Sequence, residues 1–403
     1  MKMTLALVLL ILAPSSLARC QAAPAATAGG ENLTYSLRYS ETLEIGGTLG
    51  NWHTITPSGS VNYSNGQIKH QFTLDYAGGY TATPSGPSYS TGTFQRLRVF
   101  EAFDWHKWNA TLSDDVSYLP QAPTTGFSGI PGTGEPIGYG SNPPSTQYIL
   151  TVNTHALYNN TNAGLEHMLN HASTFILAGN YDLLRFPDGN GLDTNSLTAN
   201  GGLTFRLNAR NSLTSQYLYS RFTYPGSSSV FLTNSGMFGF QRQWGRSTYS
   251  SVAIGPEWIK GSASDGIPSG LRVSAQASVT YQARLLSAAL TYTRATSGGS
   301  GYQVGAETDS VSAGLTRKFG RRSTFELSTG YLHNSDLETK QDISSIFGGF
   351  QASTRLGRYL TAFVNYTATS QSSNGQLPSN VLTQLMQVVS GGIRYSRATR
   401  PAH

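Results

Sequence analysis

The stretch from Leu271 to Arg294 (LRVSAQASVTYQARLLSAALTYTR) alternates apolar and polar residues at a period of two. Alternation of this period places the apolar side chains on one face of a β-strand and the polar side chains on the other. The pattern breaks at Gln282–Arg284 and then resumes, which predicts two strands of about ten residues joined by a short turn. Such a hairpin is the repeating unit of a transmembrane β-barrel, although a half-exposed sheet of a soluble sandwich alternates in the same way. The number of repeats along the chain decides between the two.

The same scheme recurs along the chain. Tight turns separate alternating runs near Gly66, His106, Asn170, Arg210, Gly245, Ala283, Gly320 and Gly357. Asn65-Gly66 is the strongest turn signal, because both residues tolerate positive φ. Eight such turns, with a first and a last strand, predict an all-β fold: a closed antiparallel transmembrane β-barrel of about 18 strands. Sixteen strands is the next number to consider, because bacterial barrels use even numbers.

The connections at the opposite strand ends are longer and rich in Gly, Ser, Pro and Asn. They include Pro84–Gly92, Leu119–Gln147, Pro187–Ser196, Gly261–Gly270, Gly298–Gly301 and Ser370–Pro378. Tight turns at one end and long loops at the other are typical of a barrel with periplasmic turns and external loops. Leu119–Gln147 is the longest connection and carries six prolines. It either folds inward and narrows the lumen or remains an external loop, and the sequence leaves both open.

The N-terminus has the features of an export signal. Lys2 precedes the short apolar run Leu5–Ala13, and small residues suitable for cleavage follow. We therefore expect a signal peptide and short leader over residues 1–28, and a single barrel domain over residues 29–403. The only cysteine, Cys20, lies in the leader, where it is lipidated, removed or without a role. No run of eighteen apolar residues is present, so the sequence offers no transmembrane helix.

Composition agrees with a barrel. Only 12% of the residues are charged, and the chain contains 44 glycines and 22 tyrosines. A disordered chain would carry more charge and fewer aromatic residues. The formal charge of +6 is spread along the sequence without a basic block, which argues against a nucleic-acid partner.

Aromatic residues predict the positions of the two membrane interfaces, because amphipathic rings sit at the level of the lipid headgroups. The candidates at the tight-turn ends are Trp105, Trp108 and Trp244, and those at the far strand ends are Trp258, Tyr292 and Tyr331. About ten tilted residues between the two groups would span the ~25 Å apolar band of such barrels. We therefore expect outer-membrane lipid around the wall.

Polar positions between apolar neighbours are expected to line the lumen. The candidate pore-lining residues are Lys69, Asp75, Arg206, Arg272, Glu326, Arg355 and Arg394. An excess of inward basic side chains would set an anion-favouring field. Alternatively, these side chains pair with inward acids and only fill space.

No catalytic residue, cofactor site or metal site is expected, and the chain is not expected to be an enzyme. None of the eight histidines has a serine and an acid at a spacing that aligns in the sequence, although a barrel can join distant residues. Asp114 and Asp115 are adjacent in a strand and therefore point to opposite faces. No cluster of His, Cys and Asp has the spacing of metal ligands.

The last predicted strand, Gln387–Tyr395, carries Ser390, Gly392 and Tyr395 in an arrangement similar to the terminal strand that insertion machinery reads in bacterial outer-membrane barrels. From the leader onward the chain resembles outer-membrane β-barrel proteins of the porin type. The resemblance implies the outer membrane of a Gram-negative-type bacterium, with membrane lipid, barrel-insertion machinery and small hydrophilic solutes as partners. The Gly-Arg turns and Gly298–Tyr302 are similar to large uncharacterised barrels of soil bacteria, some of which are linked with exopolysaccharide export.

Three functions follow as hypotheses. The leading one is a passive diffusion pore for small hydrophilic solutes, and an open lumen would favour it. The second is a structural or accessory barrel of an envelope assembly, for example in polysaccharide export, and a lumen filled by Leu119–Gln147 would favour it. The third is an outer-membrane hydrolase, which a serine, a histidine and an acid joined at the outer rim would favour. The solute and the oligomeric state are not encoded in any motif.

Overall fold

The computed structural model describes residues 31–46, 51–67, 69–84, 91–121, 154–189, 191–226, 229–261, 267, 269–299, 303–339, 341–375 and 385–399. The expected leader over residues 1–28, with Cys20, lies outside these ranges, as does the greater part of the expected loop Leu119–Gln147. Across the described ranges, no helix is long and apolar enough to cross a membrane.

Eighteen strands lie in the described part of the chain. They are β1 (Glu31–Gly46), β2 (Trp52–Gly66), β3 (His70–Thr81), β4 (Gly92–Trp105), β5 (Trp108–Gln121), β6 (Thr154–Met168), β7 (Ser173–Arg185), β8 (Thr194–Arg206), β9 (Asn211–Thr223), β10 (Val230–Gln243), β11 (Thr248–Lys260), β12 (Gly270–Gln282), β13 (Leu286–Ser297), β14 (Ala306–Phe319), β15 (Ser323–Asp336), β16 (Asp342–Arg355), β17 (Leu360–Ser373) and β18 (Met386–Thr399).

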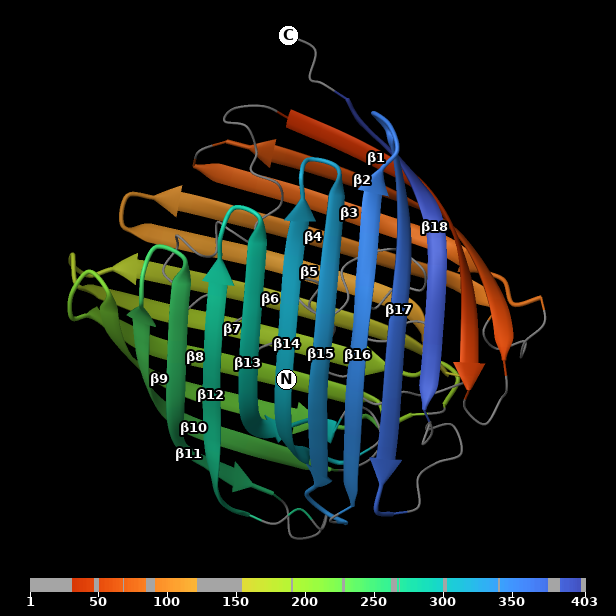
Figure 1. Ribbon diagram of the computed structural model, residues 1–403. Helices are drawn as coiled ribbons and strands as arrows, with labels where there is room; N and C mark the ends of the chain where they lie inside the picture. Colours follow the sequence, from red (N-terminus) through yellow and green to blue (C-terminus); the bar gives the residue numbers. More distant parts are fainter. Residues whose placement is uncertain are drawn as a thin grey trace.

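The sheet closes on itself. Each strand pairs antiparallel with the next one in the chain, and β1 also pairs with β18, from Leu33–Thr399 to Gly46–Met386. In Figure 1 the red β1 meets the blue β18, and the strands form one continuous wall. Closure leaves no edge strand with unpaired N–H and C=O groups, which could not be satisfied in lipid. The prediction of a closed antiparallel barrel of 18 strands is confirmed.

The connections at the two ends of the barrel differ in length. At one end, eight turns of two to four residues join β2 to β3, β4 to β5 and so on to β16 and β17. At the other end, nine connections of five to thirty-two residues join the strands. A tight turn is present near each predicted position, and His106 and Gly320 adopt the positive φ values of 37° and 64° that such turns use. The prediction that Asn65-Gly66 forms the turn itself is wrong, because both residues still pair with Phe72 and Gln71 in the β2–β3 ladder.

The limits of the long connections are less well predicted. Leu119 belongs to β5, Thr194 to β8 and Ser373 to β17, whereas the connection that begins at Gly298 continues to Gly305. Near the loop end, inward Ser, Thr and Gln residues extend the strands beyond their apolar alternation. These strand ends therefore have the composition of loops.

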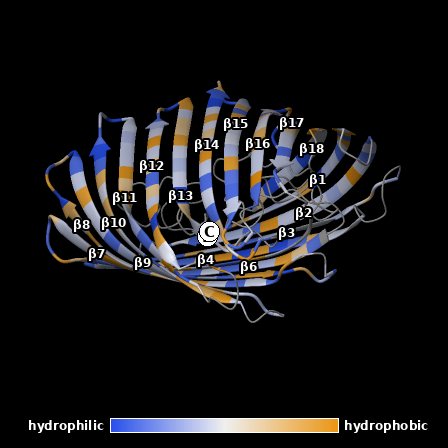
Figure 2. Ribbon diagram, turned by 90° about the horizontal axis from the view of Figure 1, so that it is seen from below, coloured by the Kyte–Doolittle hydropathy of each residue, from blue (hydrophilic) through white to orange (hydrophobic). Residues whose placement is uncertain are grey.

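The two faces of the wall have opposite polarity. In β1 the outward side chains of Leu33, Leu37 and Leu43 are exposed, whereas the inward side chains of Ser40 and Thr42 are buried. Figure 2 shows the same alternation of hydrophobic and hydrophilic residues along strands all around the barrel. An apolar outer face and a polar inner face are expected when lipid is the outer solvent.

Inward side chains are not equally buried along the barrel axis. In β16 the inward residues from Ile343 to Gln351 are buried, Ser353 is half-buried and Arg355 is exposed. In β8 the inward residues from Thr194 to Gly202 are buried, and Arg206 is exposed. Inward side chains are therefore buried in the half near the long connections and more exposed towards the tight turns.

Candidate functional site: the barrel lumen

An apolar cluster lies inside the barrel at the loop end. We call it the loop-end cluster, and it consists of Phe222, Tyr224, Phe231, Ile259, Ile267 and Leu337, with Leu192, Ala295 and Val304 packed against it. Phe222, Phe231 and Ile259 are inward residues of neighbouring strands β9, β10 and β11. Other members come from the connections that follow β7, β9, β11, β13 and β15. Five consecutive connections thus meet on one inner surface.

Specific contacts fix the connection between β13 and β14 on this surface. The Tyr224 hydroxyl donates a hydrogen bond to the carbonyl oxygen of Gly298 at 3.2 Å. At Gly305, φ is +82°, and an added Cβ would lie 2.8 Å from the ring of Phe231. Glycine is needed there both for the left-handed backbone and for the close approach. The ends of this connection therefore lie against the inward rings of Phe222 and Phe231 on β9 and β10.

The wall formed by β6 and β7 carries a buried polar network. The Tyr158 hydroxyl donates to Asp182 at 2.8 Å, and the amide of Asn160 donates to the same carboxylate. Asn162 donates to Asn160, and Asn180 donates to Asn162 at 2.7 Å. Buried polar groups are costly unless they are paired, so this network holds the inner wall in one arrangement.

Three of the candidate arginines face inward near the tight turns. Arg355 lies opposite Thr361, Thr361 opposite Arg394, and Arg394 opposite Arg38, so one row crosses β16, β17, β18 and β1. Arg206 is the last residue of β8 and faces inward at the same end. Within the described residues no ion pair includes Arg206, Arg355 or Arg394. Their charge is therefore free to act on the lumen.

Arg272 has a different environment. The ladder between β12 and β13 ends at Ala275–Arg294, and beyond it the Arg272 guanidinium forms an ion pair with Glu307 of β14. Arg294 pairs with the same carboxylate and with Asp309 at 3.2 Å. Arg272 is therefore paired with an acid and is not a free charge. The carboxylate of Glu307 offsets the positive field of Arg272 in the lumen.

The other three candidate pore-lining residues lie in different environments. Asp75 accepts a hydrogen bond from the amide of Asn62, and Glu326 faces inward on β15 between Thr316 and Gln351. Lys69 is an exposed residue directly before β3, and its backbone carbonyl accepts a hydrogen bond from the Asp104 N–H at 2.9 Å. Its place at the lumen stays a prediction.

The predicted interface aromatics lie on the outer face. Trp105, Trp108, Trp244, Trp258 and Tyr331 are all exposed. The Trp244 ring packs against the guanidinium of Arg242 at 4.1 Å. The Tyr292 hydroxyl donates to Asp309 at 2.9 Å. Their contact with lipid headgroups stays a prediction.

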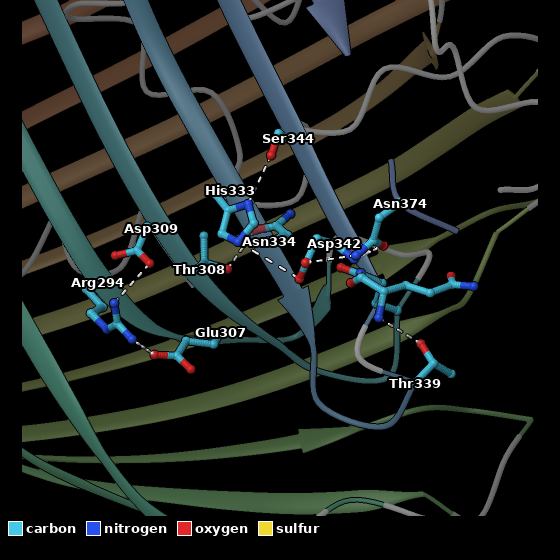
Figure 3. Close-up of polar contacts among 12 residues, drawn as sticks. Arg294, Glu307, Thr308, Asp309, His333, Asn334, Thr339, Asp342, Ser344 and Asn374 are labelled. Atoms are coloured by element: carbon cyan, nitrogen blue, oxygen red, sulfur yellow. Dashed lines mark hydrogen bonds and ion pairs between the residues drawn. The ribbon is translucent and has the colours of Figure 1, made fainter. Parts of the chain in front are cut away.

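A cluster of polar side chains lies on the outer face at the loop end, and the sequence analysis did not predict it. His333 Nδ1 lies 2.9 Å from Ser344 Oγ, and His333 Nε2 lies 3.9 Å from Asp342 Oδ1. Figure 3 shows these side chains on β15 and β16, with Asn374 beside Asp342. The available signal was the short connection between β15 and β16, since antiparallel pairing about it places His333 opposite Ser344. In the described part of the chain, no group of three or more His, Cys, Asp or Glu residues could hold a metal ion.

Comparison with known proteins gives structural matches only. No family model matches the sequence, and no curated protein matches it. The structure of Acinetobacter baumannii OccAB2 aligns with a TM-score of 0.49 at 9% identity, over 92% of this chain and 98% of that chain. Pseudomonas aeruginosa OccK5 (OpdH) aligns with a TM-score of 0.47 at 13% identity, over 92% and 98%. Pseudomonas aeruginosa OccK2 (OpdF), solved in complex with glucuronate, aligns with a TM-score of 0.47 at 12% identity, over 91% and 98%.

Proposed function

We propose that this protein is a passive diffusion pore for small hydrophilic solutes in the outer membrane of a Gram-negative-type bacterium. One observation carries the proposal: a closed wall of 18 strands is apolar outside and polar inside. The outer face matches the hydrocarbon of a bilayer, and the inner face can be wetted. Barrels of 16 to 18 strands are wide enough to leave an aqueous channel.

The lumen geometry supports a size limit set near the loop end. Solutes entering from the tight-turn end meet half-buried or exposed polar side chains, and then the loop-end cluster around Phe222 and Phe231. The narrowest part of the path therefore lies between this cluster and the opposite wall. Selection by size occurs there in the proposed pore.

Solute uptake tests this function. Purified protein reconstituted in liposomes should make them swell in isotonic solutions of small sugars, with rates that fall as the sugar becomes larger. Liposomes that lack the protein are the control. Swelling no faster than this control, for every sugar, would contradict the pore.

We also propose a weak anion preference. The unpaired guanidinium groups of Arg355, Arg394 and Arg206 remain charged at any relevant pH. In a pore with low-dielectric walls their field favours anions. The double variant Arg355→Ser with Arg394→Ser should reduce the anion preference, measured as a reversal potential across a salt gradient. Arg272→Ser should have a smaller effect, because Glu307 already offsets that charge.

The accessory barrel of an envelope assembly, for example in polysaccharide export, is the second candidate. The burial of inward side chains in the loop-end half favours it, because a packed lumen is typical of a plugged barrel. The two candidates differ in one respect: only the pore passes small solutes by itself.

We also propose that barrel-insertion machinery recognises β18, in which Ser390 and Arg394 face inward and Ile393 is exposed on the outer face.

A further inference from the structure

The polar group at the outer rim contains the side chains of a nucleophilic hydrolase. We call His333, Asp342 and Ser344 the rim triad. His333 Nδ1 is within hydrogen-bonding distance of Ser344 Oγ (2.9 Å), and the opposite ring nitrogen is 3.9 Å from the Asp342 carboxylate. A base between a hydroxyl and an acid is the arrangement that activates a serine, and it is recognised by geometry rather than by sequence order.

Rigid elements hold the rim triad. His333 lies directly opposite Ser344 in the β15–β16 ladder, and Asp342 precedes Ser344 by two residues on the same face. The Asn374 side chain donates to Asp342 Oδ2 at 3.0 Å, and the Asp342 backbone N–H donates to Asn374 Oδ1 at 2.8 Å. This double contact fixes the carboxylate at the start of β16. Sites built on strands are positioned more accurately than sites on loops.

The surroundings of Ser344 suggest how a reacting carbonyl would be held. The Tyr331 hydroxyl lies 3.5 Å from Ser344 Oγ on the same outer face. It can donate to the oxygen that becomes negative when a carbonyl is attacked. On the other side of His333 lies Asp309, which faces it across the β14–β15 ladder and pairs with Arg294. The titratable groups that face His333 are therefore Asp309, Asp342 and Tyr331.

The location indicates the substrate class. The rim triad faces outward, and the exposed apolar side chains of Tyr331 and Ile346 lie next to it on the membrane side. A substrate that reaches Ser344 from this side has an apolar part in the bilayer and a carbonyl at its surface. The acyl esters of membrane lipids have this form.

We propose that Ser344, His333 and Asp342 hydrolyse acyl esters presented at the membrane surface. Ser344 Oγ forms a bond to the ester carbonyl carbon while His333 Nδ1 takes the hydroxyl proton. The carbon–oxygen bond to the alcohol then breaks, and the same proton passes to the leaving oxygen. Water attacks the acyl-serine, His333 takes its proton and returns it to Ser344 Oγ, and a carboxylic acid is released. Asp342 is a positioning residue whose carboxylate, 3.9 Å from His333 Nε2, stabilises the charged form of the ring.

This activity is separate from conduction, because the rim triad is on the outer face and the proposed pore is inside. A variant at Ser344 should therefore leave solute uptake unchanged. The failure of one proposal does not affect the other.

The test uses the full chain in detergent micelles and in vesicles of phosphatidylcholine and phosphatidylethanolamine. A fluorophosphonate probe should label the protein covalently, and Ser344→Ala should abolish the labelling. Release of fatty acid from the vesicles should be abolished in Ser344→Ala, which lacks the nucleophile. It should fall about 10²–10⁴-fold in His333→Gln, the usual range for loss of acid–base catalysis. Ser372→Ala is the matched control, because Ser372 is an exposed outward serine directly opposite Ser344 on β17.

Asp342→Asn separates positioning from folding. It should lower kcat with little change in KM, and it should alter the pH profile of hydrolysis, while solute uptake is retained. Probe labelling that survives in Ser344→Ala, or an equal loss in Ser372→Ala, would overturn the proposal. So would the absence of both labelling and fatty-acid release from a protein that still passes solutes.

Discussion

At the scale of single residues, the faces of the strands follow directly from sequence parity. Leu271 and Val273 are exposed on the outer face, and the inward Ser274 between Val273 and Ala275 is buried. The same rule separates the adjacent acids: Asp114 accepts from Thr161 on the outer face, and Asp115 pairs with Arg96 inside. The alternation gives the face to which a side chain points, but it does not give the residues that the side chain contacts. The ion pair of Arg272 with Glu307 spans two strands and has no signal in the local sequence.

Lipid exposure can be tested on one strand. Leu290 of β13 is exposed on the outer face, and Ser287 of the same strand faces inward. Leu290→Arg should lower the free energy of unfolding in a bilayer by ~2–4 kcal/mol, the cost of a charge on the lipid face of a barrel. Ser287→Arg should cost much less. Reversible unfolding in urea with lipid vesicles measures both, and equal costs would mean that β13 does not cross a bilayer.

A pH effect is expected at one residue outside the strands. Asp188 accepts hydrogen bonds from the His155 ring at 2.7 Å and from the His155 backbone N–H at 2.9 Å. The ring hydrogen bond holds the pKa of Asp188 below its ordinary value. A lowered carboxyl pKa adds stability above the pKa of the unfolded state, and this is lost as the pH falls through the folded value. Between pH 7 and about pH 3, the urea midpoint should therefore fall less in Asp188→Asn than in the parent chain. Glu338→Gln, a change at an exposed loop residue, is the control and should show the same fall in urea midpoint as the parent chain. If the midpoint of Asp188→Asn fell as much as that of the parent chain, the ionisation of Asp188 would not contribute to stability.

At the scale of elements, strands and tight turns were predictable and the interior of the loop end was not. The turn between β12 and β13 is local chemistry, because the alternation breaks at the residues that form it, so its position can be read from neighbouring residues. The Asn65-Gly66 signal is displaced: both residues still pair with β3, and the turn follows them. The loop-end cluster joins Phe222 with Leu337 and Val304, which are far apart in the sequence. Their packing depends on five connections folding inward together, and the apolar residues involved are single positions in polar loops. Prediction from alternation therefore could not find the constriction.

The constriction can be tested on β10. Phe231→Ala removes a fully buried ring of the loop-end cluster and should cost about 3–5 kcal/mol of stability. It should also raise the single-channel conductance, because the ring narrows the mouth. Phe238→Ala is the control on the same strand, since Phe238 faces outward and is among the most exposed side chains. If both variants conduct as the parent does, the cluster does not limit the path.

At the scale of the whole molecule, the fold brings basic residues that are spread along the sequence together at the tight-turn end of the barrel. Thirteen basic residues lie in the eight tight turns or within three residues of them, and only two acids, Asp104 and Glu166, accompany them. The basic residues are Lys69, Lys107, Arg206, Arg210, Arg242, Arg246, Arg284, Arg317, Lys318, Arg321, Arg322, Arg355 and Arg358. A positive mouth raises the local concentration of anions. This clustering follows from barrel topology, because every tight turn lies at the same end.

The orientation of the barrel can be measured by labelling. The expected topology places the tight turns in the periplasm, so Gly245→Cys, Ala283→Cys and Gly357→Cys should resist a membrane-impermeant thiol reagent in intact cells. Gly226→Cys, Glu338→Cys and Ser373→Cys, at the ends or within the long connections, should react. Permeabilised cells provide the control, in which both sets should be labelled. Labelling of the tight-turn set alone in intact cells would reverse the topology.

The central claim is that a polar, lipid-enclosed lumen conducts, and single-channel recording of refolded protein in a planar bilayer tests it most directly. We expect discrete, stepwise conductance that persists over a range of voltages. Across a salt gradient, the sign of the reversal potential should indicate a preference for anions. The tight packing of the loop-end half should keep the conductance below that of an unobstructed barrel of 18 strands. Bilayers that contain inserted, folded protein but show no current steps would contradict the pore and favour a plugged accessory barrel.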